Sequence, residues 1–300
     1  MVKTTDSFAL NEWLVIGRLE DVTSARPRIT RLLGQDIRAE RDSQGAVGVW
    51  ETDGNGNKGR ALPVQERYGH IFTTLGDEPR DLLEMPEFEE EGRRLVTVGF
   101  VRVKTSPLRV VENFLDLGHF PYVHTNYLGA EPMTEVANYK VEIRADVDEI
   151  WATDCSFFQQ RAAKSATDGQ QSEYKYRVTS PFITVLYKTC PIKPGAWDLV
   201  GLFVQPIDED LCEAHSFVLP FDEENSDVDL RHFQQTIFLQ DRPILENQLP
   251  ALLPLTPGSE MPARADATSM TYRRWLKKKG ISFGVQKAPT DTKSQNNRAA

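Results

Sequence analysis

The sequence predicts an α+β fold, in which a small β-rich unit precedes a larger domain whose helices pack against one curved antiparallel sheet. Two observations predict it. Short alternating segments separated by turn residues fill residues 10–75. After residue 95 the order is a strand, a helix, a run of β-like segments and then one or two helices. The composition, with 40% hydrophobic and 26% charged residues among 300, is that of an ordinary globular protein.

The β-rich unit is expected to begin with a strand and to contain a turn at Gly-Asn-Gly, residues 54–56. Residues 28–39 alternate only loosely between apolar and polar side chains. The β candidates of this unit are residues 12–19, 28–39, 47–51, 62–65 and 68–74. Residues 77–94 are acidic and contain two prolines, and we expect them to form a solvated connector.

In the larger domain, residues 94–105 alternate like a strand, and Ser106-Pro107 then opens a helix because proline suits the first helical turn. β-like segments follow, namely residues 140–143, 149–158, 173–178, 183–189, 198–205 and 212–219, with a polar loop at 163–171. The final helices are expected over residues 226–239 and about 267–279, the second ending at Gly280. We expect residues 286–300 to be a loose tail.

Charge and composition exclude several function classes. A net charge of −9 disfavours a general nucleic-acid binder. No apolar run approaches the ~18 residues of a bilayer span, and the polar N-terminal segment lacks the apolar core of a signal peptide, so no membrane association is expected. The three cysteines, Cys155, Cys190 and Cys212, lie far apart, which favours buried thiols in a reducing cytoplasm.

A polar stripe lies within an otherwise apolar segment at residues 110–129. Asn113, Asp116 and His119 are spaced i, i+3 and i+6, which places them one turn apart on a helix. Burying polar groups is costly unless they find partners. The stripe therefore indicates a site whose polar side chains contact one another or a ligand.

A second histidine, His124, follows His119 by five residues. On a regular helix the two imidazoles diverge. Gly118 and Pro121 change this, because proline removes a helical hydrogen bond and deforms the chain. The broken turn allows both imidazoles to point at one ion.

The third ligand has to come from elsewhere in the chain. The helix at residues 226–239 has an apolar stripe that Asp241 continues one turn later, before Pro243, which we expect to break the helix. Asp241 is therefore the first candidate, and Glu246 is the second. Two imidazoles and one carboxylate with open positions opposite form the facial triad of non-haem Fe(II) oxygenases.

The alternative is that these residues have no shared chemistry. Two histidines close in sequence are often core or surface residues, and Asn113 and Asp116 fit an ordinary helix surface as well. The remaining histidines, His70, His215 and His232, have no partner that the sequence identifies, and we expect them to be structural.

The pattern Asn113-x-x-Asp116-x-x-His119-x-x-x-x-His124 resembles the catalytic-domain signature of Rieske non-haem iron oxygenases, in the monooxygenase and demethylase branch. The resemblance extends through FLQDRPILENQ at residues 238–248 and TSMTYRRWLKK at 268–278. It implies a helix-grip catalytic domain, Fe(II) bound by His119, His124 and Asp241, Asp116 as the acid that bridges the electron path, and Asn113 as a neighbouring amide.

The chain departs from this family at its N-terminal unit. The family holds a Rieske [2Fe–2S] cluster there with two Cys and two His. The first 154 residues here contain no cysteine, and residues 10–75 hold only His70. The resemblance then implies a degenerate Rieske-like unit at residues 1–76, an acidic connector at 77–94, a catalytic domain at 95–284 and a tail at 285–300.

Within the family the chain is similar to the bacterial methylxanthine N-demethylases, where one oxygenase lacks a Rieske centre and takes electrons from a reductase that carries an extra one. The resemblance implies an O2-dependent monooxygenase that demethylates a methylxanthine and releases formaldehyde. The partner reductase is expected to consume NADH. A further subunit and a homo- or hetero-oligomer are also expected. The substrate is expected to be a small aromatic molecule. The alternatives are an O-demethylase or hydroxylase of another aromatic substrate, and a non-catalytic subunit.

Overall fold

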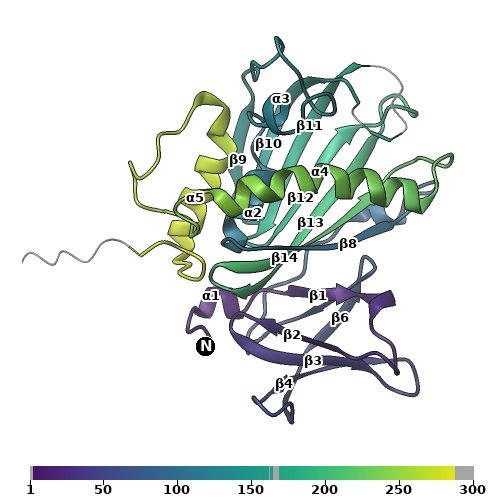
Figure 1. Ribbon diagram of the computed structural model, residues 1–300, viewed down its shortest axis with the longest axis vertical. Helices are drawn as coiled ribbons and strands as arrows, with labels where there is room; N and C mark the ends of the chain where they lie inside the picture. Colours follow the sequence, from purple (N-terminus) through teal and green to yellow (C-terminus); the bar gives the residue numbers. More distant parts are fainter. Residues whose placement is uncertain (1–2, 162, 165–168, 288–300) are drawn as a thin grey trace, which may run out of the picture.

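The computed structural model describes residues 3–161, 163–164 and 169–287. Its largest element is a curved, seven-stranded antiparallel sheet with the strand order β8-β14-β13-β12-β11-β10-β9 (Figure 1). The bounds are β8 Val96–Val103, β9 Lys140–Arg144, β10 Glu149–Gln159, β11 Gln170–Ser180, β12 Ile183–Thr189, β13 Trp197–Asp208 and β14 Leu211–Leu219. Each expected β-like segment after residue 94 is a strand of this sheet.

Two smaller sheets precede it in the chain. One has the strand order β1-β7-β6 and the other β2-β3-β4-β5. Their bounds are β1 Leu14–Arg18, β2 Arg28–Leu32, β3 Gln35–Arg41, β4 Val47–Thr52, β5 Lys58–Leu62, β6 Val64–Arg67 and β7 His70–Thr73. The loose alternation at residues 28–39 is thus a hairpin, which turns at Leu33 and Gly34 with φ values of 50° and 84°.

This hairpin turn fastens the small sheets to the large one. The Leu33 amide donates to Pro206 O at 2.7 Å, and the Gly34 amide donates to Ile207 O at 2.9 Å, both on β13. Gln205 donates to Arg31 O at 2.8 Å from a fully buried position. Figure 1 shows the small sheets packed below the large one.

The acidic connector differs from expectation. It contains a short 3-10 helix, η2 at Pro86–Glu89, and its apolar residues Leu82, Leu83 and Met85 are buried. These side chains pack in a cluster with residues of the large sheet such as Phe203. A charge-rich segment therefore lies along the surface with its few apolar side chains turned inward.

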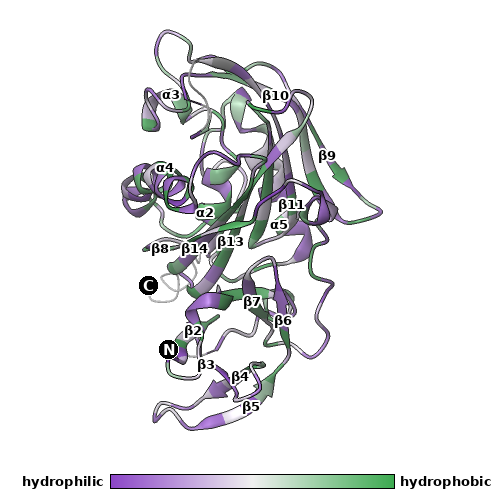
Figure 2. Ribbon diagram, turned by 90° about the vertical axis from the view of Figure 1, so that its right-hand side faces the viewer, coloured by the Kyte–Doolittle hydropathy of each residue, from purple (hydrophilic) through white to green (hydrophobic). Residues whose placement is uncertain are grey.

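The helices that matter for the site lie on one side of the large sheet, as Figure 2 shows for α2, α3 and α4. The α-helices are α1 Ser7–Leu10, α2 Pro107–Phe114, α3 Phe120–Val123, α4 Asp227–Asn247 and α5 Ala267–Lys279. Two further 3-10 turns are η1 Leu19–Asp21 and η3 Arg264–Asp266. Helix α5 has the bounds that the sequence predicts and ends at Gly280 with φ 75°. No helix in the described ranges is long and apolar enough to cross a membrane.

Two helix predictions were wrong. Helix α2 stops at Phe114, so Asp116 and His119 are not on one continuous helix with Asn113. Helix α4 does not end before Pro243 but continues to Asn247. Pro243 removes the hydrogen bond to the Leu239 carbonyl, but Leu239 is 49% exposed, so the disturbed turn lies at the surface and the helix continues past it. Most of the expected tail, residues 288–300, lies outside the described residues.

A buried ion network holds α2 against α5 and the segment between α4 and α5. The Arg109 side chain is 0% exposed and donates to Glu112 at 3.0 Å and to Glu260 at 2.6 Å. Arg273 on α5 binds the same two carboxylates. The network fixes the elements that surround the end of α2.

We expect Arg109→Ala to lower the free energy of unfolding by about 3–5 kcal/mol, because it leaves the buried Glu112 and the partly buried Glu260 without one of their two cations. Chemical denaturation measures the change. The control is Lys140→Ala, which removes an exposed pair with Asp154 (81% and 59% exposed) and should cost under about 1 kcal/mol. Equal losses for the two variants would contradict the structural role of Arg109.

Candidate metal centre

The two histidines flank a single helical turn. His119 is the N-cap and His124 the C-cap of α3, and Pro121 lies in the first turn. His124 leaves helical geometry with φ −107° and ψ 38°. The break at both ends of α3 brings the imidazoles together, with the two Nε2 atoms 3.1 Å apart.

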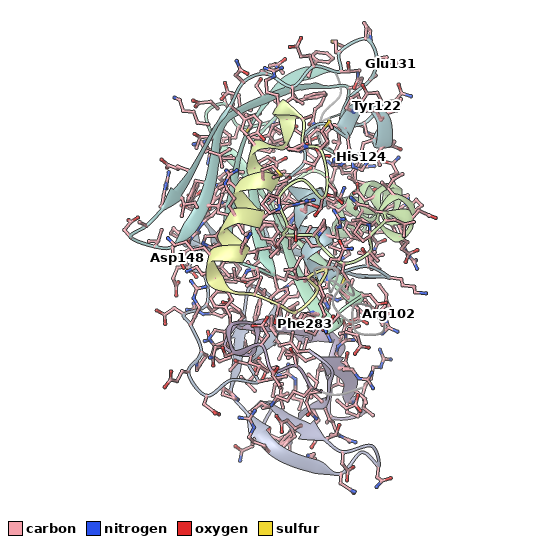
Figure 3. All side chains as sticks on the ribbon, turned by 90° about the vertical axis from the view of Figure 1, so that its left-hand side faces the viewer. Arg102, Tyr122, His124, Glu131, Asp148 and Phe283 are labelled. Carbon is pink, nitrogen blue, oxygen red and sulfur yellow. The ribbon has the colours of Figure 1, made fainter. Side chains whose placement is uncertain are left out.

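The carboxylate comes from α4. Asp241 Oδ1 lies 3.3 Å from His119 Nε2 and 3.1 Å from His124 Nε2. One potential ligand atom from each of these three residues lies within 4.8 Å of the others, so the group can hold a metal ion. His124 is 1% and Asp241 6% exposed. Figure 3 labels His124, which lies beside α4 in the part of the molecule away from the small sheets.

The second candidate, Glu246, is elsewhere. Its Oε1 accepts from the Lys104 amide at 3.1 Å and from Arg242 Nε at 3.1 Å. It lies one turn and a half after Asp241 on α4, so it faces another direction. Of the two acids, the structure brings only Asp241 to the histidines.

Each imidazole is oriented by a hydrogen bond at its other nitrogen. His119 Nδ1 lies 3.2 Å from Asp116 Oδ2, and His124 Nδ1 lies 2.8 Å from Gln240 Oε1. A donor proton on each Nδ1 leaves both Nε2 atoms as the free ligand atoms, as is usual at metal centres. Sequence reasoning missed Gln240, although its place beside Asp241 was a usable signal.

Asn113 and Asp116 are also held at the centre. Asn113 Nδ2 donates to Asp241 Oδ1 at 3.4 Å. Asp116 Oδ1 accepts from the Gly118 amide at 2.7 Å while its other oxygen contacts His119. The polar stripe predicted from the sequence is thus brought together, but by the end of α2 and the turn after it.

The electrostatics favour a bound cation. Burial opposes the charged form of His119, but hydrogen bonds with Asp116 and Asp241 outweigh it and raise the pKa of His119 to about 9. Burial likewise opposes the charge of Asp241, and the two imidazoles outweigh it, so the pKa of Asp241 lies below its usual value. At neutral pH a metal ion has to displace a proton from His119.

The centre separates two hollows. An inner cavity of about 90 Å³ lies between α4 and the large sheet, and all three residues of the triad line it. An outer cleft of about 690 Å³ is lined by Asp116 and His119 together with residues of α4 and α5. Asn113 and His119 line both. A molecule in the cavity and a molecule in the cleft therefore reach the same centre from two sides.

Tyr176 lines the inner cavity, whereas Phe182 and Phe203 are fully buried in the core. Cavity residues that sequence reasoning missed are Phe114, Phe120, Gln159, Tyr174, Lys188, Phe233 and Phe238. They come from three helices and three strands, so no single sequence spacing connects them.

We expect Asp116→Asn to lower the pKa of His119 from about 9, because it removes one of the two carboxylates that stabilise the imidazolium. An NMR titration of the imidazole in chelator-treated protein measures this value. Asp154→Asn, a change at an exposed carboxylate that pairs with Lys140, is the control and should leave it unchanged. An unaltered His119 pKa in the Asp116 variant would show that this contact is not made.

The sequence of this chain is similar to those of a known protein family and of several named enzymes. Residues 103–280 match the family described as vanillate O-demethylase oxygenase C-terminal domain. The chain is 45% identical over 280 residues to the probable methylxanthine N7-demethylase NdmC of Pseudomonas sp. (strain TJI-51), covering 93% of this chain and 98% of that protein. It is 25% identical to the methylxanthine N1-demethylase NdmA of Pseudomonas putida, covering 89% of this chain and 80% of NdmA.

Solved structures share the fold. Pseudomonas putida CBB5 NdmA with caffeine superposes with a TM-score of 0.74 at 15% identity, over 90% of each chain. Dicamba monooxygenase bound to 3,6 dichlorosalicylic acid gives 0.71 at 18% identity, over 91% of this chain and 98% of the other. The resemblance read from the sequence is confirmed. This chain belongs to the Rieske-type non-haem iron oxygenases, in the branch that carries the vanillate O-demethylase oxygenase C-terminal domain.

Proposed function

We propose that this chain is the oxygenase component of an O2-dependent demethylase that removes an N-methyl group from a methylxanthine as formaldehyde. The observation that carries the proposal is the position of His119, His124 and Asp241, which together line the inner cavity and, through His119, also reach the outer cleft. The substrate class is supported by the 45% identity to NdmC, whose name describes a methylxanthine N7-demethylase.

We assign His119, His124 and Asp241 as the ligands of one Fe(II) ion. Two imidazoles and one carboxylate are the ligand set that suits non-haem Fe(II). The buried Asp241 carboxylate and the fixed Nδ1 contacts of both histidines support the assignment. When bound there, the iron supplies the activation of O2, with two electrons that originate at NADH.

The overall reaction converts an N–CH3 group, O2, two electrons and two protons into an N–H group, formaldehyde and water. The tasks of this chain are to hold the methyl group at the ligand end of the inner cavity and to exclude water from it. Phe114, Phe120 and Phe238 form apolar walls of that cavity. Asn113 holds Asp241, and Asp116 holds His119, so the ligand atoms keep their positions while substrate enters.

We further propose that the electrons come from a Rieske [2Fe–2S] cluster on a partner reductase that binds at the outer cleft. Asp116 lines this cleft and contacts His119, so it connects the cleft to the ligand set. Ile244 and Met261 also line it and are 53% and 97% exposed, which offers apolar contact to a partner.

The N-terminal region is part of this proposal. Residues 1–76 are assigned as a Rieske-like unit that has lost its cluster, joined by residues 77–94 to a catalytic domain at 95–284. The support is the lack of cysteine in the first 154 residues, since a Rieske cluster needs two cysteine ligands. An external cluster is then required for turnover.

We expect Asp241→Ala and His124→Ala to abolish stoichiometric iron binding, and Gln240→Leu to weaken it about 10–100-fold through loss of the His124 orientation. Iron content after anaerobic loading and desalting measures this, with circular dichroism to confirm folding. Glu246→Ala, which removes the other acid of the same helix, is the matched control and should retain iron. Iron that stays after Asp241→Ala and leaves after Glu246→Ala would contradict the ligand assignment.

With iron, NADH and a reductase that carries a Rieske domain, we expect 7-methylxanthine to yield one formaldehyde per NADH oxidised. A reductase whose Rieske cysteines are replaced should support none. Vanillate is tested as a second substrate, because the matching family is the vanillate O-demethylase oxygenase C-terminal domain. Formaldehyde from vanillate alone would favour O-demethylation, no product from any substrate would favour a non-catalytic subunit, and turnover without an external cluster would refute the electron path.

A further inference from the structure

The inner cavity contains polar atoms that neither the ligand set nor its orienting contacts use. Gln159, the last residue of β10, is 1% exposed, and its Oε1 has no hydrogen-bond partner among the described residues. Tyr176 on β11 is also 1% exposed, and its hydroxyl likewise has none within that part of the chain. Because buried polar groups are almost always hydrogen-bonded, both atoms need an explanation.

The strand register explains how these side chains reach one cavity. Gln159 on β10 pairs with Gln170, the first residue of β11, and Tyr176 lies six residues further along β11, where it pairs with Ala152. Between them Tyr174 pairs with Lys188 of β12, and both of these residues line the cavity as well. Burial lowers the pKa of the Lys188 ammonium to about 8, although Asp198 opposes the shift.

Aromatic rings form much of the remaining cavity wall, together with aliphatic residues such as Leu186, Val200 and Ile237. Phe120 contacts the Tyr174 ring edge-on at 6.2 Å between centroids, and Phe114 contacts the Tyr176 ring at 6.2 Å. Phe233 and Phe238 add rings from α4. A space of about 90 Å³ between such rings favours a small planar molecule over a bulky one.

We propose that Gln159 and Tyr176 are the groups that recognise the substrate, by hydrogen bonds to an unmethylated lactam edge of a planar heteroaromatic ring. Gln159 Oε1 accepts from a ring N–H, and the Tyr176 hydroxyl donates to a ring carbonyl oxygen. The inference rests on the proposed function, because it takes the inner cavity as the substrate site. Gln159 and Tyr176 would select substrates whose ring keeps a free N–H group.

The selection follows from hydrogen-bond complementarity. An amide oxygen is only an acceptor, so a ring N–H satisfies it. An N-methyl group at that position leaves the oxygen buried and unpaired and also occupies the space that the hydrogen bond needs. 7-Methylxanthine, with two ring N–H groups, therefore binds better than caffeine, in which these nitrogens are methylated.

The test measures binding in the iron-loaded protein under anaerobic conditions without reductase, so that no turnover occurs. Isothermal titration with 7-methylxanthine, theobromine, paraxanthine and caffeine gives four dissociation constants. We expect 7-methylxanthine to bind at least tenfold more tightly than caffeine. Theobromine and paraxanthine each keep one of the two N–H groups, so whichever binds more tightly identifies the N–H that Gln159 contacts.

Gln159→Leu is expected to reduce the preference for 7-methylxanthine over caffeine at least tenfold and to leave the thermal midpoint unchanged or raised, since it removes an unpaired buried polar atom. Tyr176→Phe is expected to weaken binding of both about 2–10-fold. Gln160→Leu is the matched control, because Gln160 follows Gln159 in sequence and does not line the cavity.

Two outcomes separate this inference from the proposed function. Formaldehyde release from 7-methylxanthine together with an unchanged affinity ratio in Gln159→Leu would overturn the recognition role and leave the proposed function in place. Selective binding that depends on Gln159, without formaldehyde release in the reconstituted system, would support the recognition role and refute the proposed reaction. A wild-type protein that binds caffeine as tightly as 7-methylxanthine would also overturn the inference.

Discussion

The structure depends on bringing one buried carboxylate to two imidazoles from a distant part of the chain. Asp241 is 6% exposed and contacts His119 and His124 through a single oxygen. A carboxylate at such a position is costly to bury unless positive charge accompanies it. Helix α4, which packs along β8, carries the acid, and the broken turn at α3 carries the histidines. The large sheet is the scaffold that fixes both relative to each other.

Much of the fold could be predicted from local sequence signals. Helix α5 and strand β12 have the predicted bounds. Gly280 in left-handed geometry ends α5, and turns lie at both ends of β12. The end of α2 at Phe114 could not be predicted from spacing. In the structure Asp116 lies in the turn after the helix, where it contacts Gly118 and His119. The end of α4 could not be predicted from Pro243 for a related reason. The free energy that a proline costs a helix depends on the three-dimensional surroundings of that turn.

The site was predicted less completely than the fold. His119, His124 and Asp241 meet as the sequence suggested, since a recognisable pattern places each of them. Gln240 and the cavity residues come from α2, α3, α4, β10, β11 and β12, and their contacts depend on strand register and helix rotation. Residue spacing placed Asp116, and the position of Gln240 next to Asp241 was a further signal, but the cavity wall depends on long-range contacts and appears only in three dimensions.

The small sheets contact the large sheet through both backbone and side chains. Their hairpin turn binds the backbone of β13, and Arg28 on β2 pairs with the buried Glu213 of β14. Burial and the nearby His215 lower the pKa of His70 to about 3, so this histidine is neutral in the interface between the sheets. These contacts show that the small sheets are packed closely against the large sheet and support it.

The central claim is that this polypeptide holds one iron in a site of nitrogen and oxygen ligands and leaves the iron–sulfur group to another protein. X-ray absorption at the iron edge of the iron-loaded chain tests it most directly. The account predicts a single iron per chain surrounded by nitrogen and oxygen neighbours, with no sulfur or second iron in its coordination sphere. Iron–sulfur and iron–iron scattering of a two-iron cluster would contradict it.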